Sequence, residues 1–392
     1  MNKERVLIVH NYYQVPGGED TVVANEKKMF EDKGHEVILY SRNNSELKKY
    51  SIIRKLCLPF TSMFSFRTYR EVKVIIREKK IDIVHVHNTL GLISPSVYYA
   101  AFRCKVPVVQ TIHNFRLLCP GATFYRDGYI CEDCVSKGLR YAIKHKCYRE
   151  SFIQTLAIVI TLMIHRLLGV YKKLNYICLT QFNKEKLLSL KQVKPEKVFV
   201  KPNFVDIKQE IIPFADRKNQ FIFAGRIDKL KGLDILLEAW KLLGAEASEL
   251  VICGTGPMEE WCQDFIRKNE LTNIRMLGFV PNEHVKKIIA ESKSLILPTQ
   301  WSEGFPMTIV EAFSAGTPVI GSDIGNVGSL ITDGMSGMKF KHDSPEALAK
   351  AVKEAVGWDM VEFTFDNYCE KYTTEANYKK MVLIYAEIKL RK

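Results

Sequence analysis

Short apolar runs alternate with longer helical patterns along the whole chain. In the first half we expect strands at 4–10, 35–40, 81–87, 106–111 and 174–180. In the second half we expect strands at 220–225, 249–253, 273–278, 294–298, 317–321 and 336–340, with helices starting near residues 231, 257, 282, 307, 326 and 344. Strands that alternate with helical patterns are typical of parallel sheets with both faces covered. The pattern therefore predicts an α/β fold built from doubly wound sheets.

The alternation is interrupted at 201–220, where prolines and charged residues replace it. A chain of 392 residues exceeds what one core normally holds, so we expect two domains. We place the first over 1–203 and the second over 204–366, followed by a charged helix over 367–392 that packs back towards the first. Ligands of doubly wound sheets bind beyond the carboxyl ends of the strands. Two such domains facing each other would therefore enclose a cleft.

The chain carries a formal net charge of +13, and 47% of its residues are hydrophobic. This is the composition of an ordinary soluble protein. The positive charge favours an anionic partner: a nucleic acid, an acidic membrane face or a phosphorylated substrate. The first residues do not have the pattern of a secretory signal, and ten cysteines in so long a chain do not form a disulfide framework. We therefore expect a cytoplasmic protein in a reducing compartment.

Two loops of the second half follow expected strands and carry candidate binding residues. The stretch FAGRIDKLKG (223–232) supplies Gly225, Arg226 and Lys231 just before a helix, which is a good cradle for a diphosphate. A solvated basic loop is the alternative, and taken alone it is the more common fate of such charges. In ICGTGP (252–257), Gly254 and Gly256 would let a ligand approach the backbone, although any tight turn can use glycines.

The stretch WSEGFPMTIVEAFSAGTPVI (301–320) places Glu303 in a loop and Glu311 on the helix that follows. Proline suits the start of a helix, so free amides are expected over the turn formed by Gly304, Phe305, Pro306 and Met307. A carboxylate accepts two hydroxyl hydrogen bonds at once, so the pair suits a ligand rich in hydroxyls. Alternatively, Glu303 interacts with the helix dipole and Glu311 is solvated. Glu311 fits that alternative poorly because its neighbours are apolar, and a carboxylate there needs a partner.

In this order the three motifs, followed by AGTPVI (315–320), resemble the retaining glycosyltransferases of family four, and the resemblance covers essentially the whole chain. It implies the GT-B fold, in which two Rossmann-like domains face each other across a cleft. It also implies that Arg226 and Lys231 hold the diphosphate of a UDP- or GDP-sugar donor without a catalytic metal. Glu311 would bind the ribose, and Glu303 the transferred sugar. One departure is Ser329, which stands where the family usually has glutamate.

The first half agrees with this resemblance. Gly17 and Gly18 of PGGED (16–20) would approach the donor phosphate and the acceptor. His113 of QTIHNF (110–115) would contact the transferred sugar, although a lone histidine is more often a core residue. Asn203 of KPNFVD (201–206) would line the cleft. No positioned nucleophile is evident, so the resemblance assigns catalytic contacts to His113, Glu303, Arg226 and Lys231 only.

Four of the ten cysteines cluster in one insertion, at about 117–151. A C-x2-C pair, Cys131 and Cys134, is flanked by Cys119 and Cys147 about a dozen residues away. This spacing fits a structural zinc site, with free thiols or an exposed disulfide as the alternatives. Since four thiolates would leave no open position, we expect no catalytic role for the metal.

The most apolar segment, 151–173, is broken by polar residues and is too interrupted to span a bilayer. We expect a buried helix first, and second an interfacial helix with basic flanks at Lys144, Lys146, Arg149, Lys172 and Lys173. A further basic and aromatic stretch covers 48–70. Together these segments suit an enzyme that is peripheral on the anionic inner face of the cell membrane.

We therefore expect a retaining glycosyltransferase that moves a sugar from a nucleotide diphosphate sugar to a lipid-linked or oligosaccharide acceptor. The resemblance suggests a capsule, surface polysaccharide or lipopolysaccharide pathway, with no nucleic-acid partner. Two alternatives remain open: a nucleotide-sugar epimerase of the same architecture, and a basic zinc-containing nucleic-acid binder. The second explains the charge of +13 and the cysteines but leaves the glycine loops and carboxylates without a role.

Overall fold

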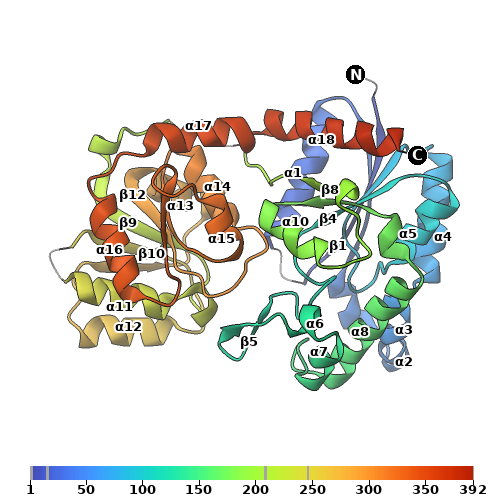
Figure 1. The fold of residues 1–392 in the computed structure, drawn as a ribbon, viewed down its shortest axis with the longest axis horizontal. Helices are drawn as coiled ribbons and strands as arrows, with labels where there is room; N and C mark the ends of the chain where they lie inside the picture. The colour runs from blue at the N-terminus through green and yellow to red at the C-terminus, as the bar shows by residue number, and fades with distance from the viewer. Residues whose placement is uncertain (1–2, 15–16, 207–209, 245–246, 392) are drawn as a thin grey trace. The chain divides into compact units, whose positions relative to one another are not determined.

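The computed structural model describes residues 3–14, 17–206, 210–244 and 247–391, so Pro16 of the expected glycine loop lies outside the described residues. The chain divides into two compact units. The first comprises Met1–Arg126, Cys131–Asn203 and Asn377–Lys392, and the second comprises Asp127–Ile130 and Phe204–Ala376. In each unit a parallel sheet has helices on both sides (Figure 1).

The first unit holds a six-stranded parallel sheet in the order β2-β1-β3-β4-β7-β8. The strands are β1 (Arg5–Tyr12), β2 (Glu36–Asn43), β3 (Ile83–Asn88), β4 (Val108–Ile112), β7 (Asn175–Cys178) and β8 (Val198–Val200). The helices are α1 (Gly18–Asp32), α2 (Ile52–Leu56), α3 (Leu58–Met63), α4 (Phe66–Glu78), α5 (Ser96–Arg103), α6 (Asp133–Ser136), α7 (Arg140–Lys144), α8 (Phe152–Leu167), α9 (Val170–Lys173) and α10 (Gln181–Leu188). Five of these strands coincide with the apolar runs of the sequence. The sixth, β8, was missed because three residues are too short to form a recognisable run.

The second unit holds a six-stranded parallel sheet in the order β11-β10-β9-β12-β13-β14. The strands are β9 (Lys218–Ala224), β10 (Glu249–Cys253), β11 (Ile274–Gly278), β12 (Ser292–Leu297), β13 (Val319–Ser322) and β14 (Gly337–Phe340). The helices are α11 (Leu233–Leu243), α12 (Glu259–Lys268), α13 (Asn282–Glu291), α14 (Met307–Ser314), α15 (Gly325–Leu330), α16 (Pro345–Ala355) and α17 (Val361–Lys371). Each strand overlaps an expected run, so the doubly wound α/β prediction is confirmed for this sheet.

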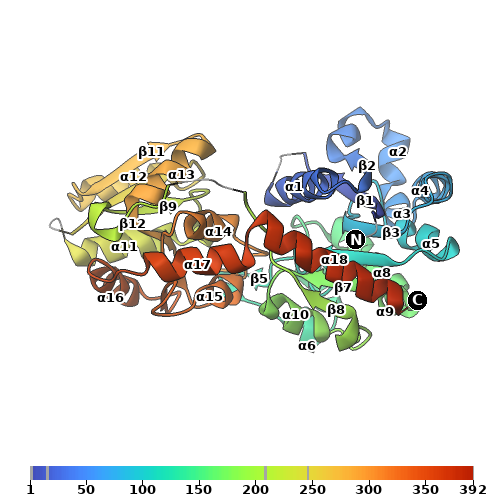
Figure 2. The same ribbon diagram turned by 90° about the horizontal axis from the view of Figure 1, so that it is seen from above.

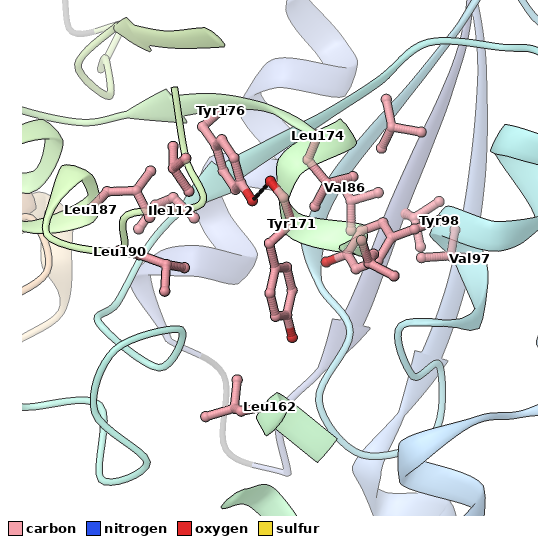
Figure 3. Close-up of a cluster of buried hydrophobic side chains, with 14 of the residues drawn as sticks. Val86, Val97, Tyr98, Ile112, Leu162, Tyr171, Leu174, Tyr176, Leu187 and Leu190 are labelled. Carbon is pink, nitrogen blue, oxygen red and sulfur yellow. Dashed lines mark hydrogen bonds between the residues drawn. The ribbon is translucent and has the colours of Figure 1, made fainter. Parts of the chain in front are cut away.

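The core of the first unit lies between its sheet and the helices that cover it. Val86 of β3 and Ile112 of β4 pack with side chains from α5, α8 and α10 (Figure 3). Tyr176 is fully buried, and its hydroxyl donates a hydrogen bond of 2.8 Å to the carbonyl of Tyr171. A buried tyrosine hydroxyl needs such a partner because it leaves water on folding. This packing fixes the strand ends at which ligands are expected.

The segment 367–392 was expected as one charged helix but forms parts of two. Helix α17 ends at Lys371, and α18 (Thr374–Leu390) begins three residues later. The Thr373 hydroxyl accepts a hydrogen bond from the amide of Ala376, and this cap starts the new helix. From Asn377 onward α18, drawn red in Figure 2, belongs to the first unit. Within this unit Tyr385 of α18 stacks on Phe30 of α1. None of the helices in the described ranges is long and apolar enough to cross a membrane.

Candidate active site

The strand order of the second unit reverses direction at the neighbouring strands β9 and β12. Such a reversal is the place where open α/β sheets bind ligands, beyond the carboxyl ends of the strands. Lys231 lies in the loop after β9, and Glu303 lies in the loop after β12. Their side chains form an ion pair, with Lys231 Nζ 2.8 Å from Glu303 Oε1. The two residues predicted to contact the diphosphate and the transferred sugar are therefore brought together at the topological switch point.

The backbone locks these two loops against each other. Gly232 has a φ of +73°, and a Cβ added there would lie 1.8 Å from the carbonyl oxygen of Pro298, so only glycine fits. The amide of Gln300 donates a hydrogen bond of 2.8 Å to the carbonyl of Leu230. Just before Gly232, the Asp228 carboxylate accepts a hydrogen bond of 3.0 Å from the amide of Lys231, and this bond closes a short turn. The position of Lys231 therefore follows from its loop as well as from its ion pair.

Glu303 is buried, and its loop is held by a residue that the sequence did not indicate. The side-chain amide of Asn326, at the start of α15, donates to the carbonyls of Glu303 at 2.6 Å and Gly304 at 2.5 Å. Asn326 is fully buried, whereas Ser329, three residues further along, is exposed. Asn326 stands close to the position of the family departure in GNVGSL, and that short polar side chain was the available signal. In the part of the chain that the structure describes, no side chain caps the start of α14, and the amide of Ile309 donates to the carbonyl of Pro306 at 3.2 Å.

Arg226 and Glu311 interact with residues other than Lys231 and Glu303. The Arg226 side chain is 69% exposed, and its Nε lies 3.3 Å from Asp228 Oδ2. Glu311 is partly buried on α14, and its Oε1 accepts a hydrogen bond of 3.4 Å from Asn282. Burial raises the pKa of Glu311 above its ordinary value. Among the described residues no hydrogen bond or ion pair joins Arg226 or Glu311 to the Lys231–Glu303 pair, so their roles stay predictions.

Gly254 and Gly256 are required by the fold itself. A Cβ at Gly254 would lie 1.8 Å from the carbonyl oxygen of Gly225, and one at Gly256 would lie 2.2 Å from that of Ile227. The loop after β10 therefore packs directly on the loop after β9. This contact gives both glycines a structural reason, and the approach of a ligand to them stays a prediction.

The strand order of the first unit reverses at β1 and β3. Gly17 precedes α1 next to this point, and its amide donates to the Asp20 carboxylate at 2.9 Å. Its φ is −135°, and a Cβ there would meet nothing within 4 Å in the described part of the chain. Gly17 is thus not required by its own backbone or by its neighbours, unlike Gly254. Gly18 is the first residue of α1.

Two polar side chains at this switch point were missed by the sequence interpretation. His10, near the end of β1, is fully buried, and its Nε2 lies 2.7 Å from Asp20 Oδ1. The Glu19 carboxylate accepts a hydrogen bond of 3.1 Å from the Tyr13 hydroxyl, and burial raises the pKa of Glu19 to about 8. Perturbed carboxyl groups of this kind are concentrated at functional sites. The acidic residues of PGGED, Glu19 and Asp20, are the signal that the sequence offers at this point.

His113 follows β4 and takes part in a chain of buried polar groups. Its Nε2 lies 2.9 Å from Nδ1 of His87, whose Nε2 lies 3.5 Å from Glu26 Oε2. Glu26 Oε1 in turn lies 2.9 Å from Nζ of Lys201, and neither side chain is exposed. Burial lowers the pKa of His113 to about 3, so its ring is neutral at physiological pH. His113 can therefore exchange hydrogen bonds with a sugar hydroxyl but does not supply a charge.

Within the described ranges, Glu26, His85 and His87 are the one group of three metal-ligating side chains whose donor atoms all lie within 4.8 Å of one another. The ammonium of Lys201 already lies 2.9 Å from the Glu26 carboxylate. Burial raises the pKa of Glu26, but Lys201 and His87 outweigh this effect and keep the pKa below its ordinary value. We interpret the group as a buried ion pair in which lysine provides the charge that a metal would provide.

A cavity of about 110 Å³ opens beside His113 in the first unit. His87, His113 and Gln110 form polar parts of its lining. Apolar parts come from Ile112, Leu117, Ile158 and Leu162, of which the last two lie on α8. A largely apolar pocket with a few polar groups is typical of a small-molecule site.

Asn203 lies in the segment that follows β8. Its side chain is buried, and its Oδ1 has no hydrogen-bond partner among the described residues. A buried amide oxygen without a partner is costly. The observation is compatible with the predicted ligand contact, which stays a prediction.

The four cysteines of the insertion lie in one region, but their sulfur atoms do not all lie close together. Cys119 and Cys134 are both buried in the core cluster of the first unit, and each thiol affects the pKa of the other. The neighbouring Cys119 and burial raise the pKa of Cys134, and the charges of Cys147 and Cys131 add to this shift. No three of these four sulfurs meet the 4.8 Å spacing within the described chain. The zinc site stays a prediction at this point.

Two families match the chain. Residues 205–364 match the family described as Glycosyl transferases group 1, and residues 16–209 match the family described as Glycosyltransferase Family 4. An uncharacterized glycosyltransferase of Methanocaldococcus jannaschii is 22% identical over 97% of this chain and 96% of its own. The alpha-monoglucosyldiacylglycerol synthase of Streptococcus pneumoniae is 24% identical over 96% of this chain and 83% of its own.

Solved structures agree with the fold. A glycosyltransferase of Rickettsia africae superposes with a TM-score of 0.69 at 16% identity, over 99% of both chains. The HepE protein of Anabaena, solved in complex with UDP and glucose, superposes with a TM-score of 0.63 at 14% identity, over 98% of this chain and 99% of that one. Together with the two sheets and their switch points, these matches establish that the chain belongs to the family-four type of glycosyltransferases with the GT-B fold.

Proposed function

We propose that the protein transfers a sugar from a UDP- or GDP-sugar to a lipid-linked glycan acceptor, with retention of configuration at the transferred carbon. The observation that carries the proposal is the Lys231–Glu303 pair at the switch point of the second unit. A cation and a carboxylate beside the uncapped start of α14 suit a ligand that has both a diphosphate and sugar hydroxyls. HepE, whose fold is similar, was solved with UDP and glucose, which supports this class of donor.

In the proposed reaction these residues act mainly by stabilising charge on the donor. The bond between the sugar carbon and the leaving phosphate breaks while a bond to the acceptor oxygen forms from the same face. The acceptor proton passes to the leaving phosphate oxygen. Lys231 and Arg226 stabilise the charge that grows on the diphosphate, so we expect them to replace a catalytic metal. Glu303 and the neutral His113 hold hydroxyls of the transferred sugar.

The acceptor class is proposed from the first unit. The cavity beside His113 is lined by apolar side chains of α8, which suits the apolar part of an amphiphile. The relative from Streptococcus pneumoniae is named for a glucosylated diacylglycerol. A pathway of surface polysaccharide synthesis fits both points, and the proposed place of work is the inner face of the cell membrane.

The outer side of the same helices supports membrane contact. On α8, five apolar side chains are exposed although the opposite side of the helix is buried: Phe152, Ile153, Ile160, Met163 and Leu167. Helix α3 packs against α8, and the His165 ring lies 3.1 Å from the carbonyl of Met63. Further exposed apolar residues lie on and near α2 and α3, namely Ile52, Ile53, Leu56, Phe60 and Phe66. Exposed lysines and arginines on the same stretch, Lys48, Lys49, Arg54, Lys55 and Arg67, suit an anionic leaflet.

The donor is tested by a thermal-shift panel of UDP- and GDP-sugars. One of them should raise the unfolding midpoint of the wild type, and Lys231→Met should cancel the rise. The proposal fails if no nucleotide sugar shifts the midpoint and no nucleotide is released with any lipid-linked acceptor. An epimerase would instead convert the donor in the absence of an acceptor.

Membrane contact is tested with vesicles that contain phosphatidylglycerol. Binding at low salt should weaken in Ile53→Glu and remain in Phe279→Glu, which changes an equally exposed apolar residue of the second unit. Equal binding by both variants, or no binding by the wild type, would remove the membrane from the proposal. A salt-dependent mobility shift with RNA or DNA would favour the nucleic-acid alternative.

A further inference from the structure

We propose that Cys119, Cys131, Cys134 and Cys147 bind one structural zinc ion that fixes the segment 117–151 next to His113. Each of these cysteines lies in the first unit. The proposal rests on contacts within this segment and is independent of the donor and acceptor proposed above.

The contacts join residues that are distant in the chain. Cys119 and Cys134 interact within one buried cluster although they lie fifteen positions apart in the chain. A Cβ added at Gly121 would lie 3.0 Å from the carbonyl oxygen of Cys147 and 3.8 Å from the sulfur of Cys119. The turn after Cys119 and the backbone of Cys147 therefore pack directly on each other. Three of the four ligand positions are thus fixed close together by the fold.

The fourth cysteine is held by a backbone contact to the same turn. The amide of Cys131 donates a hydrogen bond of 2.7 Å to the carbonyl of Phe124. Arg126 Nη2 lies 3.2 Å from Asp133 Oδ2 and fastens the start of α6, which carries Cys134. Since no three sulfurs yet lie within 4.8 Å of one another, zinc would draw Cys131 and Cys147 towards the Cys119–Cys134 pair.

The turn after Cys119 is held by backbone hydrogen bonds. The amide of Cys119 donates to the carbonyl of Phe115 at 2.8 Å, and the amide of Ala122 donates to the carbonyl of Cys119 at 2.8 Å. The backbone is therefore fixed on both sides of this cysteine.

Backbone strain is concentrated in the same segment. Ten described non-glycine residues have positive φ, and six of them fall within 117–151: Ala122, Phe124, Asp127, Lys146, Arg149 and Glu150. Such conformations persist only where the surrounding structure enforces them. In this segment the regular structure that could enforce these conformations consists of short helices and one pair of two-residue strands. A cross-link through four thiolates provides the missing constraint.

Four thiolates in the C-x2-C arrangement select zinc in preference to hard cations. The position of the segment gives the ion its role, since Leu117 lines the cavity beside His113. The carbonyl of Leu117 also accepts a hydrogen bond of 2.6 Å from Arg166 of α8. Zinc would thus hold the wall of the cavity and would take no part in the chemistry.

The metal content of the full-length protein, purified without an affinity tag and dialysed against metal-free buffer, provides the test. Elemental analysis should give one zinc per chain for the wild type and for Cys369→Ser, which changes an exposed cysteine on α17. Cys134→Ser should contain less than a tenth of this amount. Absence of zinc from the wild type, or one zinc per chain in Cys134→Ser, would overturn the proposal.

A second measurement avoids variants that fail to fold. A mercurial thiol reagent added to the folded wild type should release one zinc, followed with a chromophoric chelator. Cleavage by protease within 117–151 should become at least tenfold faster as zinc leaves. Intact mass spectrometry without reducing agent distinguishes the alternative, because two disulfides among these cysteines would lower the mass and exclude the metal.

Discussion

The ammonium nitrogen of Lys231 lies 2.8 Å from Oε1 of Glu303, and this contact joins the loop after β9 to the loop after β12. Both side chains are shielded, with 24% and 9% of their surfaces exposed. A shielded pair resists screening by salt better than a surface pair does. In the proposed function Lys231 contacts the donor diphosphate and Glu303 contacts hydroxyls of the transferred sugar. The ion pair would then hold both side chains in position before the donor binds.

Replacing Lys231 by methionine should abolish the donor-dependent thermal shift and lower kcat/KM roughly 100-fold or more, because a charge-assisted contact to the developing diphosphate charge is lost. Steady-state kinetics with the donor identified by thermal shift provides the measurement. Lys229→Met is the matched control, since Lys229 is exposed in the same turn. If the two variants behave alike, the loop contributes only general positive charge, and Lys231 does not contact the diphosphate.

Glu311 should show opposite effects on stability and on binding. Its pKa is raised by burial, so the ionised form is disfavoured in the folded state and costs stability once the pH exceeds the folded pKa. Glu311→Gln should therefore raise the unfolding midpoint of the free protein at pH 8. It should also weaken nucleotide binding by roughly 10- to 100-fold, since hydrogen bonds from the ribose to a charged acceptor are lost.

Differential scanning fluorimetry and calorimetric titration with the nucleotide measure the two effects of Glu311→Gln separately. The matched control is Glu283→Gln, which changes an exposed glutamate of the neighbouring helix α13. A Glu311→Gln variant that binds the nucleotide as tightly as the wild type would show that Glu311 does not hold the ribose.

Gly17 and Gly254 should respond differently to the same change. Gly254→Ala places a Cβ 1.8 Å from a carbonyl oxygen, so the variant should lose several kcal/mol of stability or fail to fold. Gly17→Ala places a Cβ in open space, so the unfolding midpoint should stay within about 2 °C of the wild type. Activity of Gly17→Ala should nevertheless fall at least tenfold if a ligand approaches the backbone there. Full activity of this variant would remove Gly17 from the site.

The sequence predicted most of the fold because buried parallel strands are continuous apolar runs, and such runs are visible without any partner strand. It missed β8, which has three residues, and the break after Lys371, where the capping Thr373 was not weighed. The Lys231–Glu303 contact could not be predicted from spacing alone. It joins residues 72 positions apart and depends on the order of strands, which local patterns do not encode.

Side chains that support the site were harder to predict than those expected to touch the ligand. Asn326 holds the Glu303 loop, and the signal for it in the sequence is limited to a short polar residue beside the departure from the family pattern in GNVGSL. The ion pair of Glu26 and Lys201 joins α1 to the segment after β8 across 175 residues, and in the sequence each residue resembles an ordinary surface charge. Long-range polar contacts of this kind become visible only once the fold is known.

Buried histidines should make the protein sensitive to mild acid. Burial lowers the pKa of His85, His87 and His113 below the ordinary value of 6.5, and that of His113 falls to about 3. The unfolded chain therefore binds protons that the folded chain does not, and stability decreases as the pH falls below 6.5. Each such histidine contributes a slope of up to about 1.4 kcal/mol per pH unit.

Urea unfolding between pH 7.5 and about pH 5 measures this slope, which should correspond to the uptake of more than one proton per chain on unfolding. His87→Gln should remove close to one proton from that uptake, because glutamine does not titrate. A His87→Gln variant with the same proton uptake as the wild type would mean that the His87 ring already takes up its proton in the folded state. The chain from His113 to Glu26 would then carry a positive charge at His87.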